Sequence, residues 1–228
     1  MVGVHPVAAE WFADVYGGGN ITERSRFSLD GNLDGAAVAG FIADVHFEKS
    51  FTVGGRFGYW FESLTFFGVS LDASHFRPDI NAQTAMGKGQ IIDSRGALFG
   101  VPITVSGAAP VKLPEVDFRV TAVAPNLMLR WPMLVSTNFP HGQFQPYLTV
   151  GPALYIVDLE GFHPSRFDPK TSIGGQGGGG VAWEFTKNVG VFSEYRYTHV
   201  RPALESGDIV FKTHLSTHHL LGGISLRF

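Results

Sequence analysis

The chain has 228 residues, a formal net charge of -3 at pH 7 and no cysteine. The slightly acidic balance argues against a nucleic-acid partner, and the lack of cysteine excludes a disulfide framework and a thiolate metal site. Charged residues make up 16% of the chain, against about 25% in soluble domains. No apolar run approaches the ~18 residues of a membrane helix. Apolar and aromatic content without such runs favours a membrane β-barrel, with a soluble β-sandwich or lipocalin-like barrel as the alternative.

The first residues carry a possible processing signal. Val7, Ala8 and Ala9 are small residues just before Glu10, and they resemble the end of a secretory signal peptide. The basic and apolar regions of such a peptide are missing. We therefore expect 1–9 to be the remnant of a signal peptide or a disordered N-terminus, and 10–228 to be one membrane β-barrel domain.

Alternation of apolar and polar residues with a period of two predicts β-strands of the length that a tilted membrane strand needs. Strand 51–61, for example, places Val53 and Phe57 on one face and Arg56 and Trp60 on the other. We find no helix of convincing amphipathic period. The predicted strands are 10–19, 51–61, 65–76, 118–131, 144–157, 172–185, 189–201 and 214–228.

The connections between these strands alternate in length. Long connections at one end and short turns at the other are typical of an up-and-down outer-membrane barrel. We therefore predict an all-β fold, an eight-stranded antiparallel up-and-down transmembrane β-barrel with two long extracellular loops, 20–50 and 77–117. Alternating segments 36–47 and 97–105 lie in these loops, and we expect them to pair and extend the barrel wall above the membrane.

Charged side chains recur on the faces opposite the apolar ones. They are Asp14, Arg56, Asp72, Arg130, Glu184, Glu194, Arg196 and Arg227. An eight-stranded lumen is just wide enough for side chains to fill, and an unpaired charge there costs several kcal/mol. We therefore predict a lumen salt-bridge network that plugs the barrel. Glu194 and Arg196 are expected to pair with strands 172–185 or 214–228.

A run of glycines at 174–180 lies within one predicted strand. We interpret it as space for aromatic rings and for tight curvature. The alternative, a phosphate-binding loop, needs a strand-to-helix context and a Lys-Ser/Thr pair that this stretch lacks.

The last strand presents an apolar face that ends in an aromatic residue: Leu220, Ile224, Leu226 and Phe228. This ending resembles the closing strand of a bacterial outer-membrane barrel. Segments 53–62 (VGGRFGYWFE) and 194–199 (EYRYTH) also resemble small members of the porin-like barrel superfamily, which includes the eight-stranded barrel of outer membrane protein A.

The resemblance covers nearly the whole chain from Glu10, apart from the two long loops. It implies residence in the outer membrane of a Gram-negative-type bacterium, contact with outer-membrane lipid and lipopolysaccharide, and recognition of the C-terminal strand by the barrel assembly machinery. Its motifs are weakly specific for function.

Histidines suggest two kinds of chemistry, and the sequence supports neither. His199 could activate a serine, as in lipid A deacylases, but position 201 is Arg where that pattern has Ser. His214 and His218 share a face but lie roughly 13 Å apart, and His219 points to the other face. We predict no catalytic residues, no metal site and no cofactor.

Three functions therefore remain open. The first, which we favour, is a structural or interaction role in which loops 20–50 and 77–117 contact an extracellular or membrane partner. The second is a narrow pore for small solutes, and the third is a lipid A-modifying enzyme.

Overall fold

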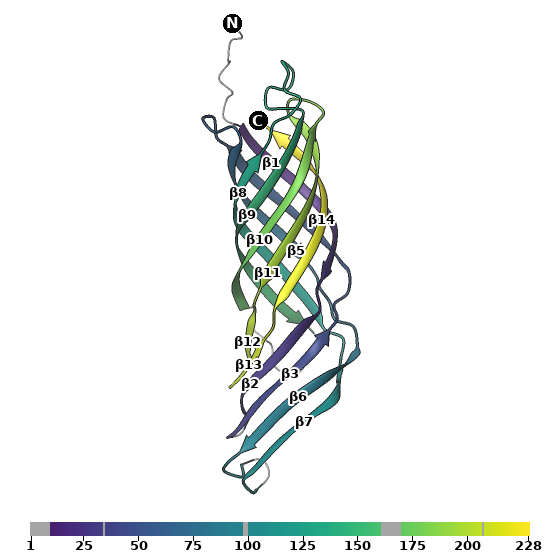
Figure 1. Ribbon diagram of the computed structural model, residues 1–228, viewed down its shortest axis with the longest axis vertical. Helices are drawn as coiled ribbons and strands as arrows, with labels where there is room; N and C mark the ends of the chain where they lie inside the picture. Colours follow the sequence, from purple (N-terminus) through teal and green to yellow (C-terminus); the bar gives the residue numbers. More distant parts are fainter. Residues whose placement is uncertain (1–9, 34, 98–99, 161–169, 207) are drawn as a thin grey trace.

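The computed structural model describes residues 10–33, 35–97, 100–160, 170–206 and 208–228, which form fourteen strands (Figure 1). Among these residues there is no helix long and apolar enough to cross a membrane. The predicted signal-peptide remnant, 1–9, lies outside the described residues. Both ends of the described chain lie at the same end of the molecule.

Eight strands close into an antiparallel barrel in the order β1-β14-β11-β10-β9-β8-β5-β4. Each predicted strand is confirmed, with its ends within three residues of those expected. The barrel is closed where β1 pairs with both β14 and β4, so it has no free edge. The barrel strands are β1 (Glu10–Thr22), β4 (Ser50–Trp60), β5 (Phe67–Phe76), β8 (Asp117–Arg130), β9 (Phe144–Glu160), β10 (Lys170–Glu184), β11 (Val189–Val200) and β14 (Leu215–Arg227).

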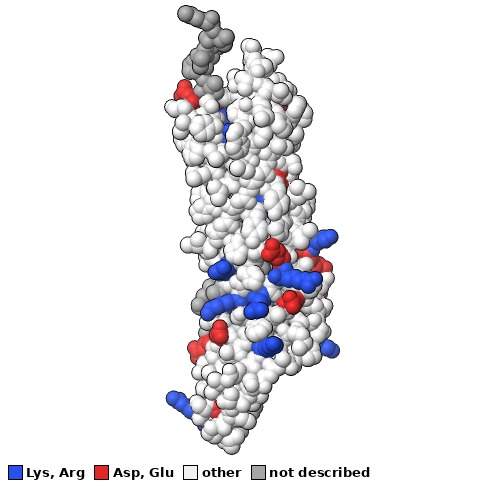
Figure 2. Space-filling model, in the orientation of Figure 1, with Lys and Arg blue, Asp and Glu red and all other residues white. Residues whose placement is uncertain are grey.

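Exposure alternates along the barrel strands, with apolar side chains outside. Val15, Ile173 and Leu220 are 72%, 80% and 66% exposed, whereas Arg196 and Glu194 inside are 1% exposed. Charged atoms are sparse on the barrel surface and gather in a band beyond it (Figure 2). An apolar exterior around a charged interior reverses the arrangement of a water-soluble protein and suits a lipid surrounding.

We predicted that the long connections form extracellular loops. They instead form the strands of a second sheet, which lies beyond the end of the barrel that is remote from the termini (Figure 1). Its order is β12-β13-β2-β3-β6-β7. Its strands are β2 (Ser25–Leu33), β3 (Ala36–Val45), β6 (Gln83–Asp93), β7 (Ile103–Leu113), β12 (Ala203–Ser206) and β13 (Ile209–Lys212).

The expected pairing of 36–47 with 97–105 is wrong. Strand β3 pairs with β6, and β6 lies between β3 and β7. Among the described residues of 97–105, which exclude 98 and 99, only the last three belong to a strand, and they pair with Ile91, Ile92 and Asp93. The physical reason is that β6 and β7 form a local hairpin, which closes with less loss of chain entropy than a pairing between distant segments.

Candidate functional site

The lumen of the barrel is the candidate site because it collects buried charges. All eight residues of the predicted lumen salt-bridge network are buried on the inner face. They form two clusters. The first, which we call the central cluster, contains Asp14, Arg56, Asp72, Glu194 and Arg196. The second, which we call the terminal cluster, contains Arg130, Glu184 and Arg227.

Arg56 joins two carboxylates from different walls of the barrel. Its Nε and Nη2 lie 2.9 and 2.8 Å from Asp14 Oδ2, and its Nη1 lies 2.9 Å from Glu194 Oε2. Asp14 is directly opposite Arg56 on the neighbouring strand, whereas Glu194 comes from β11 across the lumen. Arg56 therefore links opposite walls.

Arg196 holds a second carboxylate from across the barrel. Its Nη1 and Nη2 each donate to Asp72 at 3.0 Å, which is the bidentate geometry of a strong guanidinium–carboxylate pair. Its Nε donates to Glu194 Oε1 at 2.8 Å. Tyr16 completes the arrangement, since its hydroxyl donates to Asp72 and accepts from Arg196.

The expected partners of Glu194 and Arg196 are therefore wrong. We expected partners on the neighbouring strands β10 or β14, but the ion pairs run across the lumen to Arg56 on β4 and Asp72 on β5, and between Glu194 and Arg196 themselves. A narrow lumen brings opposite walls within reach of long side chains, so the closed barrel and not the neighbouring strand selects the partner.

The terminal cluster lies near the end that carries the chain termini. Arg130 Nη1 lies 2.5 Å from Glu10 Oε2, and its Nε donates to the Thr65 carbonyl at 2.8 Å. Arg227 contacts Glu10 at 3.4 Å and Glu184 at 3.1 Å. Glu10 was missed because it begins the first strand, although period-two spacing from Asp14 would have placed it inside.

Aromatic rings fill the space around the guanidinium groups. Arg56 lies 5.4 Å from the Tyr147 ring and 5.3 Å from the Phe192 ring, and Arg130 lies 4.3 Å from the Trp60 ring. Cation–π attraction offsets part of the cost of removing these cations from water. Tyr147 was missed as a network member, yet its hydroxyl donates to Glu194 at 2.8 Å.

Inward glycines make room for these rings. A Cβ on Gly180 would lie 2.8 Å from the Tyr147 hydroxyl, and one on Gly174 would lie 2.8 Å from the Tyr155 ring. Both glycines belong to the run at 174–180. The contacts support the structural interpretation of that run.

Beyond the central cluster the lumen changes from charged to polar and then to apolar. His219 contacts Thr52 and Thr198 hydroxyls at 2.8 and 3.1 Å, and Gln176 donates to Asn126 at 3.0 Å. An apolar cap follows, which includes Val120, Ala122, Tyr155, Val157, Val200 and Leu215, with Phe27 and Phe47 packed against it.

Two of the histidines weighed in the sequence analysis, His199 and His218, lie at the remote end of the barrel. His199 Nδ1 lies 2.9 Å from the hydroxyl of Ser216 on the adjacent strand, and His218 contacts Glu23 at 2.8 Å. Ser216 is only 3% exposed, and no described carboxylate pairs with His199. In the described part of the chain, no three metal-ligating side chains come together.

The C-terminal residues Leu220, Ile224, Leu226 and Phe228 all point outward, with exposures from 48% to 66%. Phe228 exchanges two backbone hydrogen bonds with Trp11, at 2.9 and 3.0 Å, and its ring lies 6.4 Å from that of Phe57. The last residue thus completes the seam between the two ends of the barrel.

A closed eight-stranded barrel with a lipid-compatible exterior and a charged, filled interior defines a transmembrane barrel of the outer-membrane type. The model of the outer membrane protein beta-barrel domain family matches residues 1–228, and the chain belongs to this family. The protein therefore resides in the outer membrane of a Gram-negative bacterium.

Solved structures agree with this fold. The chain is 14% identical to Neisserial surface protein A, with a TM-score of 0.50 over 96% of this chain and 97% of that one. It is 13% identical to OprG from Pseudomonas aeruginosa, with a TM-score of 0.53 over 98% and 97%. At such identities the likeness shows the fold alone. No curated protein sequence matches the chain.

Proposed function

We propose that this protein is a closed outer-membrane barrel that presents its second sheet to an extracellular partner. The observation that carries the proposal is the amphipathic character of that sheet, whose apolar face continues from the apolar cap of the lumen. Short turns face the periplasm and long connections face outward in barrels of this type, so the second sheet lies outside the cell.

Closure is supported by the successive layers of side chains in the lumen. The terminal cluster, the central cluster and the apolar cap follow one another along the barrel. Each guanidinium is held by carboxylates or rings from other walls, so opening a path for solutes would require ion pairs to break in a low-dielectric interior. The packing favours a plug over a narrow pore.

In planar bilayers we expect the wild-type protein to show no steady conductance. Insertion is verified on the same sample by the shift in gel mobility between unheated and boiled protein, and an open porin in the same bilayer serves as the positive control. A reproducible open state of the inserted, folded barrel would contradict the plug and favour the pore.

The apolar face of the second sheet contains a groove that runs across its strands. The floor is a row of directly paired glycines, Gly40, Gly89 and Gly107, on β3, β6 and β7. One wall is the adjacent row Val38, Ile91 and Val105.

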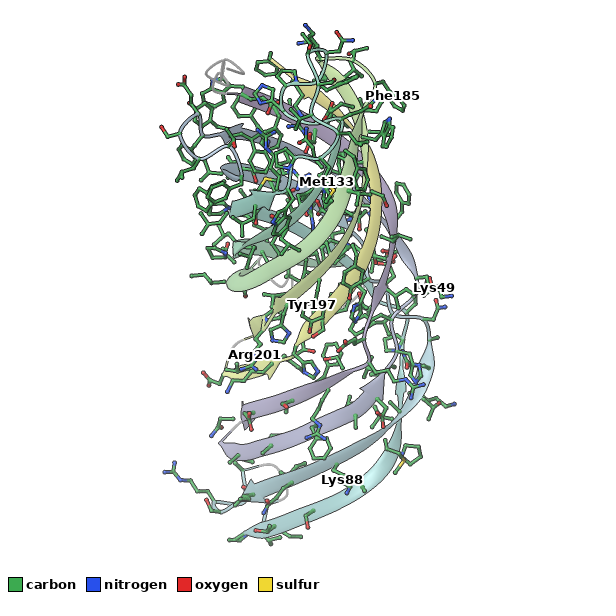
Figure 3. All side chains as sticks on the ribbon, turned by 45° about the horizontal axis from the view of Figure 1, so that its top comes forward. Lys49, Lys88, Met133, Phe185, Tyr197 and Arg201 are labelled. Atoms are coloured by element: carbon green, nitrogen blue, oxygen red, sulfur yellow. The ribbon has the colours of Figure 1, made fainter. Side chains whose placement is uncertain are left out.

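The opposite face of the same sheet carries Arg26, Asp30, Lys88 and Ser106, and Figure 3 labels Lys88 there. A sheet with one charged and one apolar face leaves the apolar face exposed to water unless something covers it. A narrow apolar ridge of a partner protein matches the groove.

Cross-linking from adjacent positions tests this proposal. A photoreactive residue at Val105 points into the groove, and one at Ser106 points to the charged face. On intact cells exposed to the extracellular medium of the native habitat, we expect a specific product from position 105 and none from 106.

Gly107→Leu provides the competition control because it fills the groove without disturbing the sheet. A Cβ at Gly107 meets no atom within 4 Å. The product from position 105 should disappear in this variant. Equal products from both positions, or a product that Gly107→Leu does not change, would contradict the proposal that the groove binds a partner.

The C-terminal strand is proposed to be the segment that the barrel assembly machinery recognises. We expect Phe228→Ser to lower the amount of protein assembled in the outer membrane severalfold, because the exposed terminal ring is lost. Leu220→Ser, on the same outward face of β14, is the control. Equal assembly of the two variants would argue against a special role for the terminal ring.

A further inference from the structure

Strand β7 forms one edge of the second sheet, and among the described strands it pairs with β6 alone. It has 11 residues, of which 103–110 are all exposed, whereas the strand at the other edge, β12, has only 4. Of the strands in this sheet, β7 lies farthest from the barrel (Figure 1). A long edge strand presents a row of unpaired backbone N–H and C=O groups to the medium.

Pro110 indicates which backbone groups of β7 point outward. In an antiparallel pair, a residue directs both its N–H and its C=O either toward the partner strand or away from it. Pro110 lies opposite Met86 and has no N–H, and a proline in an edge strand takes a position where this group would face solvent. Because the direction alternates along a strand, Ala108, Ser106 and Thr104 also direct their backbone groups away from β6.

Two prolines limit this free edge. Pro102 lies four residues before Ser106, and Pro110 lies four residues after it. The seven residues between the prolines, 103–109 (ITVSGAA), include no charged residue. Natural edge strands are commonly blocked by prolines, charges or bulges. The middle of β7 is therefore an unblocked segment with Ser106 at its centre.

The same segment of a second copy matches this edge. In an antiparallel pairing with a two-fold axis at Ser106, the two Ser106 residues lie opposite each other and Thr104 lies opposite Ala108. Since all three residues point outward on both strands, they form three hydrogen-bonded pairs with about six hydrogen bonds. Pro102 then lies opposite Pro110, outside the paired segment. A shift by two residues in either direction would place a proline opposite Ala108 or Thr104.

The side chains are compatible with this pairing. Val105 would lie opposite Gly107 of the second copy on the apolar face, and a Cβ added to Gly107 meets no atom within 4 Å, so the valine has room. Lys112 would lie opposite Gly100 of the second copy, so that the two lysines do not meet. Like charges directly opposite each other would destabilise a strand pair.

We propose that β7 pairs with β7 of a second copy in an apposed membrane and joins the two second sheets into one. The position of β7 on the side remote from the barrel allows two facing membranes to bring these edges together (Figure 1). Seven residues a side is well below the roughly 20–30 of a stable interface. A single pairing is therefore weak, and many copies on two surfaces supply the strength. The edge is distinct from the apolar groove, and the proposal does not rest on it.

Cysteine cross-linking between nanodiscs tests this pairing. The chain has no cysteine, and each disc carries one full-length copy, so a disulfide must join two membranes. Ser106→Cys is compared with Thr104→Cys and Ala108→Cys, which are exposed positions on the same edge and face. Paired Cα atoms about 5.5 Å apart allow a disulfide, whereas the two copies of residue 104 would lie roughly 13 Å apart along the strands. Gel mobility without heating verifies that each variant is folded.

We expect Ser106→Cys to form about tenfold or more disulfide-linked dimer than Thr104→Cys or Ala108→Cys alone, because only residue 106 meets its own copy. A mixture of Thr104→Cys and Ala108→Cys should form the mixed dimer. Ser106→Pro in both members of the mixture should abolish it, because this change removes an outward N–H without removing a bond to β6.

Equal yields from the three single-cysteine variants, or a mixed dimer that Ser106→Pro leaves unchanged, would overturn the proposal. The assay contains no other protein, so its failure leaves the groove proposal as it stands. In the photo-cross-linking on intact cells, a product between two copies has twice the mass of the chain. It is thereby distinguished from the product of an extracellular partner.

Discussion

Replacing Arg196 by methionine is expected to lower the free energy of unfolding by about 3–5 kcal/mol, the usual cost of breaking a buried ion pair by removing one partner. The guanidinium donates to Asp72 twice, at 3.0 Å, and to Glu194 at 2.8 Å. Without it, Asp72 keeps only the Tyr16 hydroxyl among these contacts. Urea unfolding in phospholipid vesicles, followed by tryptophan fluorescence and gel mobility, measures the loss.

The double variant Asp72→Leu/Arg196→Met separates charge from packing. It removes one charge of each sign, so the central cluster keeps its net charge, whereas the single variant leaves an additional uncompensated carboxylate. Buried pairs replaced together by apolar residues often cost little. We therefore expect the double variant to be more stable than Arg196→Met. A double variant that is less stable than the single one would show that Asp72 stabilises the cluster without Arg196, through contacts such as the one with Tyr16, and that the loss in Arg196→Met is not the cost of an uncompensated carboxylate.

The second large effect is expected at Gly54, where alanine should cost about 1–3 kcal/mol by overpacking the lumen. A Cβ there would lie 2.5 Å from the Tyr16 Cζ and Oη and 2.6 Å from the Ala73 carbonyl oxygen. The backbone oxygen cannot move without disturbing the pairing of β4 with β5. The midpoint urea concentration in vesicles measures this change.

Gly19→Ala is the matched control, because a Cβ on this barrel glycine meets no atom within 4 Å. Its unfolding midpoint should stay at the wild-type value. If Gly54→Ala is as stable as Gly19→Ala, the Tyr16 ring can move aside without cost, and the rings do not depend on the inward glycines for their position.

Local alternation was enough to predict the eight barrel strands. A period of two is a property of neighbouring residues, so β11 shows its inward Glu194 and Arg196 in the sequence itself. The same alternation correctly predicted that Asp14, Arg56 and Arg130 face inward. The inward and outward faces of a membrane strand can be assigned from its sequence, because lipid on one side and a filled lumen on the other give each face a different chemistry.

Pairing across the lumen could not be predicted. Arg56 and Glu194 are 138 residues apart, and nothing in either strand indicates that they meet. The second sheet was predicted only in part: the alternating segment 36–47 coincides with β3, but the pairing of the sheet was not predicted, because its strands combine small residues with charged ones. In β7, the stretch Gly107, Ala108, Ala109 and Pro110 has no strong strand preference, and only pairing with β6 orders it.

The sequence by itself therefore determined the barrel strands, their faces and the charges of the lumen, because these depend on residues one or two positions apart. Only the tertiary structure decided which charges pair and that the long connections form a sheet. These features join residues from distant strands. Their geometry follows from barrel closure, which the local pattern does not contain.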